Sequence, residues 1–389
     1  MKRKGRQALR FVLLVGAMSF FADFTYEGAR AIAGPYLALL GATGAAVGIA
    51  SGFGELLGYG LRLVSGRLAD KTRQFWPITI VGYIVQMIAV PLLALARSWP
   101  AAAGLLVVER IGKATRNPPR DVMLSHAGKQ MGGYGWAFGL HEALDQFGAL
   151  IGPLAMAGIL LLRHDYRLAF LALAIPAAVT LLLLTAARLL YPRPEDLEPE
   201  KSSASTGKFP RAFWLYLAGA ALVGAGFADF PLIAYHFQKS SVVSGGSIPV
   251  FYAIAMGVGG AGSLLFGKLF DRHGTIVLVP LTIFSAAYAP LSFLGGRWVS
   301  LAGVAVWGIG FGVHESVIAA VVATMVGPAR RASAYGIFTA GFGVAWFLGS
   351  ALLGLLYDAS LPALVVVASA LELAAIPFFY AVAGREKTA

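Results

Sequence analysis

The sequence predicts an all-α membrane protein in which twelve transmembrane helices form two six-helix bundles related by a pseudo-two-fold repeat. Apolar residues make up 58% of the 389 positions and charged residues 13%. In a soluble domain, roughly half of the residues are apolar and about a quarter are charged. The apolar residues occur in long runs, such as 80–96, 168–184 and 361–382, which approach or reach the ~20 residues that cross about 30 Å of hydrocarbon as a helix. An internal repeat is the third observation.

Six spans are expected in each half of the chain. Apolar runs separated by polar connections place their centres near residues 22, 53, 85, 111, 147 and 178, and then near residues 224, 256, 283, 312, 345 and 372. The N-terminal bundle therefore covers residues 1–190 and the C-terminal bundle residues 211–389. Residues 191–210 are rich in Pro, Glu, Ser and Lys, which is typical of a solvated linker that lets one bundle move relative to the other.

The chain repeats itself at an offset of 201 residues. The residues that recur are Gly58, Gly66, Asp70, Tyr134, Gly135 and Gly148, which match Gly259, Gly267, Asp271, Tyr335, Gly336 and Gly349. A second match, residues 21–24 against 227–230, has an offset of 206. Two homologous halves in an apolar chain indicate a transporter, because a site between two similar bundles can open to either side when one bundle rocks against the other.

The formal net charge of +12 is concentrated in alternate connections. Lys and Arg residues cluster in 2–10, 67–73, 193–211, 268–272, 330–331 and 385–387. By the positive-inside bias both termini are expected in the cytoplasm, with the chain in a cell membrane such as the bacterial inner membrane. This placement argues against nucleic acid as a partner.

The basic N-terminus precedes a full-length span without a small-residue cleavage site, so we do not expect it to be a removable signal peptide. The absence of cysteine excludes disulfides.

The connection after the second span carries a family resemblance. Residues 66–73 read G-R-L-A-D-K-T-R and resemble the motif G-x-L-A-D-[R/K]-x-G of the major facilitator superfamily, and residues 267–274 resemble its second copy. Arg73 stands where the family has glycine. The resemblance implies a fold of two six-helix bundles and a gating role for five residues: Gly66, Asp70, Arg120, Gly267 and Asp271.

Two further motifs refine the class. Leu106 and Arg110 resemble the family's arginine motif, with Lys113 where many members have glutamine. The residues Gly139, Gly148, Gly152 and Pro153 are similar to the glycine-proline motif of proton-linked antiporters, although Met156 and Ala157 replace its terminal glycine pair. The resemblance implies an exporter or antiporter. The alternative is that these small residues only allow helices to pack closely in lipid.

Charged residues within the spans are the other functional signal, because each costs several kcal/mol unless it is paired or faces water. Asp23, Glu27 and Arg30 share one face of the first span. Glu55 and Arg62 have the same kind of spacing on the second span and are expected to form a structural ion pair.

These positions give the candidate site. We expect proton coupling at Asp23, Glu27 and Asp145. We expect the substrate to contact Arg30, Arg110, Lys113, His141, Glu142, Asp229, His236, His314 and Glu315. The charges are concentrated in the first half, which predicts that this half carries proton coupling while the second supplies mainly aromatic and apolar contacts.

The predicted function is secondary active transport by alternating access, as a monomeric, proton-coupled antiporter that exports a small organic molecule. One alternative is uptake symport of an organic anion held by Arg30, Arg110 and Lys113. Another is transport of a divalent metal such as iron, with Asp23, Asp229 and His236 as ligands. No cofactor or resident metal is expected. Enzymatic activity is not expected either, because the sequence lacks both H-E-x-x-H and a nucleotide-binding G-x-x-x-x-G-K-[ST] motif.

Overall fold

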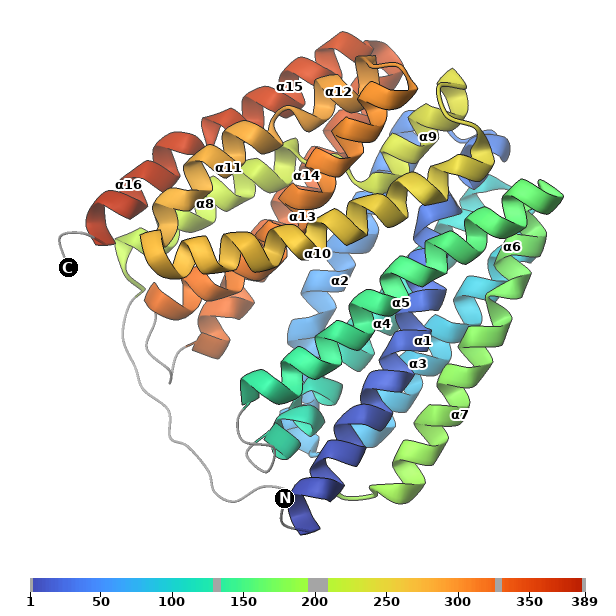
Figure 1. Ribbon diagram of the computed structural model, residues 1–389, viewed down its shortest axis with the longest axis vertical. Helices are drawn as coiled ribbons and strands as arrows, with labels where there is room; N and C mark the ends of the chain where they lie inside the picture. Colours follow the sequence, from blue (N-terminus) through green and yellow to red (C-terminus); the bar gives the residue numbers. More distant parts are fainter. Residues whose placement is uncertain (1–2, 129–133, 195–208, 326–330, 387–389) are drawn as a thin grey trace.

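The computed structural model describes residues 3–128, 134–194, 209–325 and 331–386, and these residues are almost entirely helical (Figure 1). The first half contains α1 (Arg3–Leu39), α2 (Gly44–Thr72), α3 (Phe75–Leu92), α4 (Trp99–Gly128), α5 (Tyr134–Arg163), α6 (Tyr166–Ala172) and α7 (Ala174–Leu190). The second half contains α8 (Arg211–Gly226), α9 (Phe230–Ser240), α10 (Ile248–His273), α11 (Leu278–Ser285), α12 (Tyr288–Leu294), α13 (Arg297–Met325), α14 (Arg331–Ala359), α15 (Leu361–Ala374) and α16 (Ile376–Glu386).

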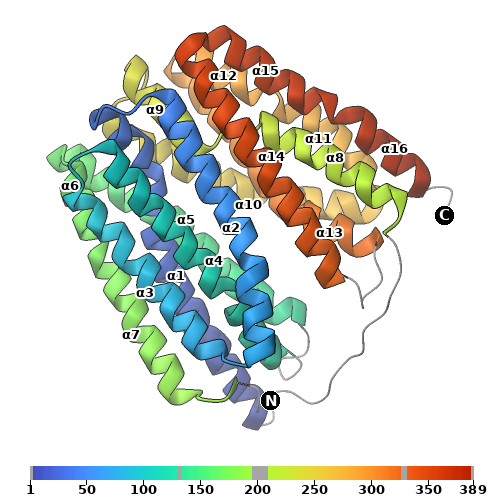
Figure 2. The same ribbon diagram turned by 180° about the vertical axis from the view of Figure 1, so that it is seen from behind.

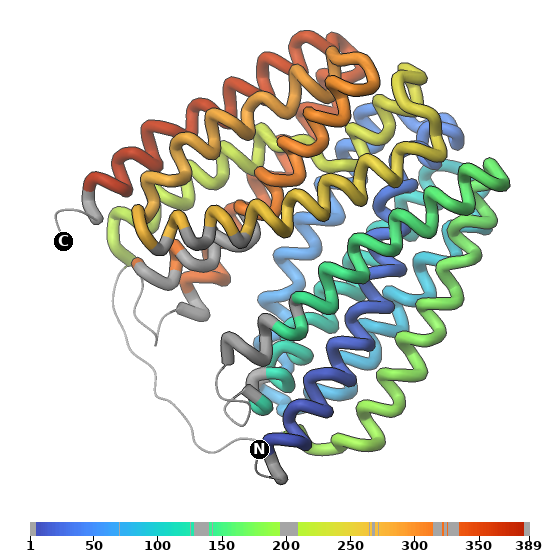
Figure 3. The backbone as a smooth tube through the Cα atoms, viewed as in Figure 1, coloured from blue at the N-terminus to red at the C-terminus, as the bar shows by residue number. Residues whose placement is uncertain are grey.

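The helices form two groups, α1–α7 and α8–α16, which confirms the predicted fold class (Figures 1 and 2). Both described ends of the chain lie on one side of the molecule, here called the terminal side. The two groups lie close together on the opposite side, here called the far side, and they diverge toward the terminal side, as the backbone trace in Figure 3 also shows. The boundary at residues 191–210 stays a prediction, because residues 195–208 lie outside the described part.

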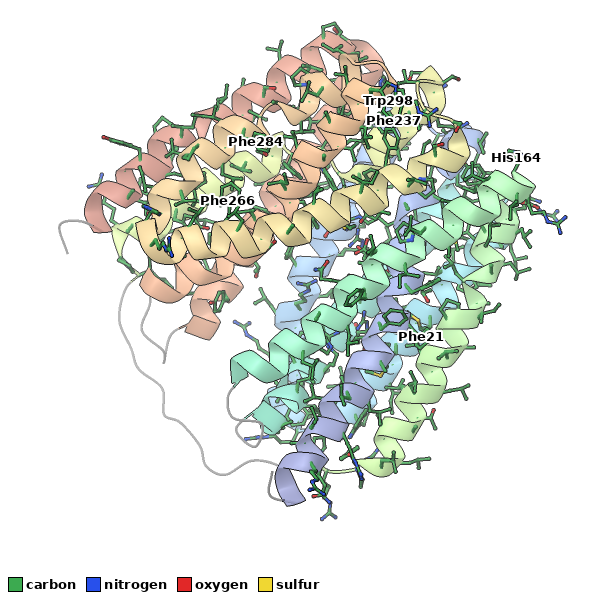
Figure 4. All side chains as sticks on the ribbon, in the orientation of Figure 1. Phe21, His164, Phe237, Phe266, Phe284 and Trp298 are labelled. Atoms are coloured by element: carbon green, nitrogen blue, oxygen red, sulfur yellow. The ribbon has the colours of Figure 1, made fainter. Side chains whose placement is uncertain are left out.

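Helical segments occupy all twelve predicted positions. Within the described residues, eight stretches are by themselves long and apolar enough to cross a membrane. The other four positions are filled by α2, α4, α10 and α13, which are repeat-related in pairs, α2 with α10 and α4 with α13. Apolar side chains also project from the outer surface: Phe284 on α11 is 45% exposed and Trp298 on α13 is 74% exposed (Figure 4). Such a surface is suited to lipid.

One predicted span is broken in the middle. The chain unwinds between α8 and α9 at residues 227–229, whereas the matching residues 21–24 are helical within α1. Pro231 explains the difference, because it cannot donate the hydrogen bond that would continue the helix through residue 227; the equivalent residue of the first half is Thr25. Tyr288 and Trp307 bind the freed backbone: the Tyr288 hydroxyl donates to Gly226 O (2.7 Å) and Trp307 Nε1 donates to Ala228 O (2.8 Å).

Both copies of the loop motif end in a residue with positive φ, in two different conformations. Gly274 has φ 67° and ψ −157°, whereas Arg73 has φ 56° and ψ 18°, in the left-handed region. Glycine adopts this region without steric cost, which explains the family's preference, while a residue with a Cβ pays roughly 1–2 kcal/mol. The Arg73 N–H still donates to Ala69 O at 2.8 Å, so the helix end is capped despite the departure from the motif.

The motif glycines of α5 pack against α1. A Cβ at Gly148 would overlap Phe20 O, and one at Gly152 would overlap Phe24 O. The repeat partner Gly349 is in the same position, because a Cβ there would overlap Ala225 O on α8. Close helix packing is therefore the role of these glycines that the geometry supports directly.

We expect Gly148→Leu to lower stability, because the new side chain would force α5 away from α1. Overpacking of this kind costs typically about 1–3 kcal/mol, and a backbone obstacle raises the cost. Thermal unfolding in detergent, followed by the monodisperse fraction, measures the effect. Gly158→Leu on the same helix is the matched control, since no atom lies within 4 Å of a Cβ at that position. Equal melting temperatures for the two variants would contradict the packing role.

Candidate functional site

A cluster of buried charges joins the two halves where α1 meets the broken helix. Arg30 Nη2 on α1 lies 2.6 Å from Asp229 Oδ1, which is the residue that begins α9. The exposed fractions are 6% for Arg30 and 1% for Asp229. Within the first half, Glu55 Oε1 on α2 lies 3.5 Å from Arg30 and 2.8 Å from Arg110 Nη2 on α4. These four residues, with Glu27, Glu109, Lys113, Tyr26 and Tyr252, are called the central cluster below.

Glu27 makes the second link between the halves. The Tyr252 hydroxyl on α10 donates to Glu27 Oε2 at 2.5 Å, and both side chains are buried. Glu27 and Arg30 lie three residues apart on α1, so one face of this helix presents both links to the second half. Any movement that separates the halves here must break the Arg30–Asp229 ion pair and the Tyr252–Glu27 hydrogen bond.

Three cations surround the ring of Tyr26. Lys113 Nζ lies 3.6 Å from the ring centroid, and the Cζ atoms of Arg110 and Arg30 lie at 4.9 Å and 6.0 Å. A tyrosine face attracts cations electrostatically. A pocket beside this ring is lined by Tyr26, Arg30, Ser51, Glu109 and Arg110 of the first half and by Pro231 of the second half. Tyr26 was not among the expected site residues, since an aromatic residue in an apolar span carries no distinctive pattern.

On the far side, backbone groups of one half are bound by side chains of the other. Asp358 on α14 accepts from Gly44 N (2.8 Å) and Ala45 N (2.7 Å) and so caps the start of α2. The Tyr235 hydroxyl on α9 donates to Ala42 O at 3.0 Å. A carboxylate at a helix N-terminus is favoured by both the free N–H groups and the helix dipole. The far side is therefore sealed by specific contacts as well as by packing.

A second polar network lies within the first half, toward the terminal side. Arg116 on α4 is fully buried; its Nη1 donates to the Tyr83 hydroxyl (2.8 Å) and its Nη2 lies 3.4 Å from Asp23 Oδ1. Gln86 on α3 accepts from Arg116 Nε (2.5 Å) and donates to Glu109 Oε1 (2.6 Å). All of these partners belong to one bundle, so this network does not depend on how the halves are arranged.

Further along α1, Ser19 connects three expected site residues. Its hydroxyl lies 2.8 Å from His141 Nε2 and accepts from Arg120 Nη1 at 3.2 Å. His141 Nδ1 lies 3.7 Å from Asp145 Oδ2, one turn away on α5. Arg120 also contacts Asp121 at 2.9 Å. Asp145, expected to take part in proton coupling, is thus part of a network of the first half.

The structure brings together part of the expected site. Glu27, Arg30, Arg110, Lys113 and Asp229 meet in the central cluster. Asp23 faces Arg116 and not Arg30, and His236 contacts the Tyr357 hydroxyl at 3.1 Å. The expected Glu55–Arg62 pair is not the observed one: Glu55 binds Arg30 and Arg110, while Arg62 lies over the Tyr59 ring at 5.5 Å. Among the expected site residues, the backbone alone is described at seven positions: Asp70, Gly139, Glu142, Gly267, Asp271, His314 and Glu315.

Comparison with known proteins is consistent with this architecture. The family model "Major Facilitator Superfamily" matches residues 12–350. An uncharacterized protein of Mycobacterium tuberculosis is 42% identical over 387 residues, covering 98% of this chain and 94% of the relative. An uncharacterized MFS-type transporter of Methanocaldococcus jannaschii is 24% identical over 374 residues, covering 91% and 90%.

Solved structures with this fold include the nucleoside transporter NupG, with a TM-score of 0.74, 17% identity and coverage of 95% of this chain and 99% of that chain. A bacterial homolog of the human lysosomal transporter Spinster, in an inward-facing and unoccupied conformation, has a TM-score of 0.68, 17% identity and coverage of 99% and 96%. At these identities the likeness concerns the fold.

Proposed function

This chain belongs to the major facilitator superfamily, so it is a multi-pass membrane transporter, and we propose that it exports a small organic molecule in exchange for protons. The observation that carries the proposal is the central cluster, since it places ionisable groups at the junction that must open and close. A site between two bundles works by alternating access only if its contacts differ between the two states. Arg30–Asp229 and Glu27–Tyr252 are such contacts.

The charge balance of the cluster supports a proton as the coupling ion. Among the described residues it contains four carboxyl groups, Glu27, Glu55, Glu109 and Asp229, against three cations, Arg30, Arg110 and Lys113. An excess carboxylate in a buried site is costly, and one bound proton restores neutrality. Binding of that proton changes which ion pairs can form.

The proposed cycle is a competition at Arg30 and Asp229. We place both termini in the cytoplasm, so the structure, closed on the far side, faces inward. Substrate entering from the cytoplasm contacts the cluster and competes with the Arg30–Asp229 pair, and the bundles then rock apart on the far side. Protonation from outside neutralises a carboxylate, weakens its hold on a substrate or cation, and favours return to the inward state.

A reconstitution experiment tests this proposal. Purified protein is first screened by thermal shift against metabolites, drugs and divalent metals, and the strongest organic ligand is then added to proteoliposomes that contain a pH-sensitive dye. We expect substrate movement in one direction to produce proton movement in the other. Substrate flux without any pH change, or pH change in the same direction as the substrate, would contradict antiport. Flux of a metal alone would favour the metal alternative.

Lys113 favours one second candidate, transport of an organic anion by proton symport. Its ammonium lies 3.6 Å from the centroid of the Tyr26 ring, and Glu109 is a carboxyl group with which it interacts electrostatically. An anionic substrate could bind this ammonium beside the Tyr26 ring. The metal alternative gains no such support, because Asp23, Asp229 and His236 each contact a different partner and the described residues contain no group of three possible ligands.

We expect Lys113→Gln to weaken the binding of anionic ligands by roughly tenfold to a hundredfold, the value of about 1.5–3 kcal/mol for a charged hydrogen bond. Binding of neutral or cationic ligands should change little. Calorimetric titration of ligands of each charge class measures this. Arg62→Gln is the matched control, because Arg62 also lies over a tyrosine ring but outside the cluster. An equal loss for all ligand classes would contradict direct contact between Lys113 and an anion.

A further inference from the structure

A buried carboxyl group of the second half lies outside the central cluster. Glu372 is on α15 and is 0% exposed. Neither of its carboxyl oxygens makes a hydrogen bond of normal geometry to any described residue. An ionised carboxylate without a partner is among the most costly groups in a protein interior, so Glu372 holds a proton in this state. A structural role alone does not account for a buried carboxyl group that makes no hydrogen bond of normal geometry.

Among the described side chains, no cation lies beside Glu372 on the helices that pack against α15, namely α8, α11, α12, α14 and α16. The titratable side chains that these elements carry among the described residues are Arg211, Tyr216, Tyr288, Tyr335, Tyr357, Asp358 and Tyr380. Of these, Tyr288 on α12 interacts with Glu372, and Ser285 on α11 is its other polar neighbour. Both neighbours are hydroxyls, which stabilise a neutral acid and can pass on a proton.

These hydroxyls begin a row that leads toward the far side. Ser285, Tyr288 and Ser292 follow one another at spacings of three and four residues, so they share one face of α11 and α12. All three are fully buried. Ser300 on α13 extends the row, because its hydroxyl donates to Ser292 O (3.3 Å) and Gly295 O (3.2 Å) at the far-side connection. The hydroxyls of Ser285 and Ser292 make no hydrogen bond of normal geometry to the described residues, so both are able to bind a transient water.

Glu372 also lies next to the end of α8, where the broken helix is interrupted. A Cβ at Gly226 would come within 2.6 Å of Ala368 O and 3.0 Å of Glu372 N, so the end of α8 rests on α15 at this level. The Tyr288 hydroxyl donates to Gly226 O (2.7 Å) and accepts from Ala228 N (2.6 Å), so its proton and one of its two acceptor positions bind the backbone at the break. The break ends at Asp229, which pairs with Arg30.

We propose that Glu372 is a second proton-binding site, which exchanges its proton with the far side along the hydroxyl row of Ser285, Tyr288 and Ser292. When Glu372 releases the proton to water, the carboxylate requires a donor, and Tyr288 is the adjacent one. Tyr288 then leaves Gly226 O, and residues 227–229 lose the bond that holds them. The proton state of Glu372 is thereby linked to the position of Asp229. This site is separate from the one in the proposed function and does not require it.

Infrared difference spectroscopy of purified wild-type protein, Glu372→Gln and Asp165→Asn tests the proposal without any substrate. We expect a carboxylic acid C=O band in the wild type that is absent from Glu372→Gln and present in Asp165→Asn, where an exposed carboxylate is changed to a residue that still caps α6. The band should shift on transfer to D2O while the protein stays folded. Ser292→Val should slow that shift by about tenfold or more, because it removes a hydroxyl from the row.

Several outcomes overturn the proposal. If the band remains in Glu372→Gln, another group holds the proton. If the wild-type band does not shift in D2O, Glu372 is a structural acid that does not exchange. If Ser292→Val exchanges at the wild-type rate, the route is different. Glutamine mimics the protonated form, so failure of Glu372→Gln to fold would also contradict it. None of these readouts depends on transport, so failure here is distinguishable from failure of the export proposal.

Discussion

Asp229→Asn is expected to shift the transporter toward the state that is open on the far side and to abolish most coupled transport. The substitution removes the charge that pairs with Arg30 at 2.6 Å. It keeps the helix start, because Asp229 Oδ1 accepts from Phe230 N and asparagine is an equally good cap. Loss of one partner from a buried ion pair costs about 3–5 kcal/mol. A shift of that size changes the ratio of the two states by roughly a hundredfold or more.

The absence of cysteine makes the measurement direct, since introduced cysteines are the sole labelling sites. Spin labels at Arg97→Cys and Arg297→Cys report the distance between the two halves on the far side, because these exposed residues precede α4 and begin α13. We expect longer distances in Asp229→Asn than in the parent. The double variant Arg30→Gln with Asp229→Asn removes both charges and should recover stability but not coupling. An unchanged distance distribution in Asp229→Asn would show that the pair does not control the far side.

The fold was largely predictable because it depends on patterns along the chain. Apolar length and the 201-residue offset predicted the positions of the helices and their division into two similar halves. The break between α8 and α9 was not predicted, although its cause is visible in the sequence. Gly224, Gly226 and Pro231 favour an interruption, yet proline and glycine also occur inside transmembrane helices without breaking them. Pro35 and Pro153 lie inside the continuous helices α1 and α5.

The site was predictable only in part, for a geometric reason. Residues three or four apart share a helix face whatever the fold, so Glu27 and Arg30 were correctly placed together. The rotation and height of one helix relative to another depend on packing, and this decides which partner each charge meets. Glu55 therefore binds Arg110 on α4 instead of Arg62 on its own helix, and Asp23 binds Arg116.

The uncharged residues that bind the buried carboxyl groups were the hardest part of the site to predict from the sequence. Tyr252 and Gln86 bind Glu27 and Glu109, but a lone tyrosine or glutamine in an apolar span fits many roles. The sequence predicted that charged residues are concentrated in the first half, and the structure shows what these charges contact in the second half. The charged face of α1 and α4 lies against aromatic residues of the second half: Phe230 packs on Tyr252 at 4.3 Å between ring centroids, and Arg30 lies 5.6 Å from the Phe311 ring.

Glu27→Gln is expected to abolish transport driven by a proton gradient while substrate exchange persists. Glutamine has nearly the shape of the protonated acid and can still accept the bond from Tyr252, so the variant should imitate a permanently protonated Glu27. Exchange of substrate across the membrane needs no net proton movement and should continue. Substrate binding should also become independent of pH, because the group whose charge competes with it is gone. Counterflow and gradient-driven uptake in the same proteoliposomes separate the two activities.

Tyr252→Phe is the complementary control, because it removes the bond between the halves that Glu27→Gln retains and leaves the Glu27 carboxyl group in place. If the charge carries coupling, Tyr252→Phe should retain gradient-driven transport with an altered rate, and Glu27→Gln should not. Asp23→Asn and Asp145→Asn test the other two expected proton sites, which lie next to Arg116 and His141 of the first half. Full gradient-driven transport in Glu27→Gln together with its loss in Asp23→Asn or Asp145→Asn would move the coupling site into that network. Retention in all three variants would refute proton antiport through these carboxylates, because a coupled exchanger cannot work without a group that changes charge during its cycle.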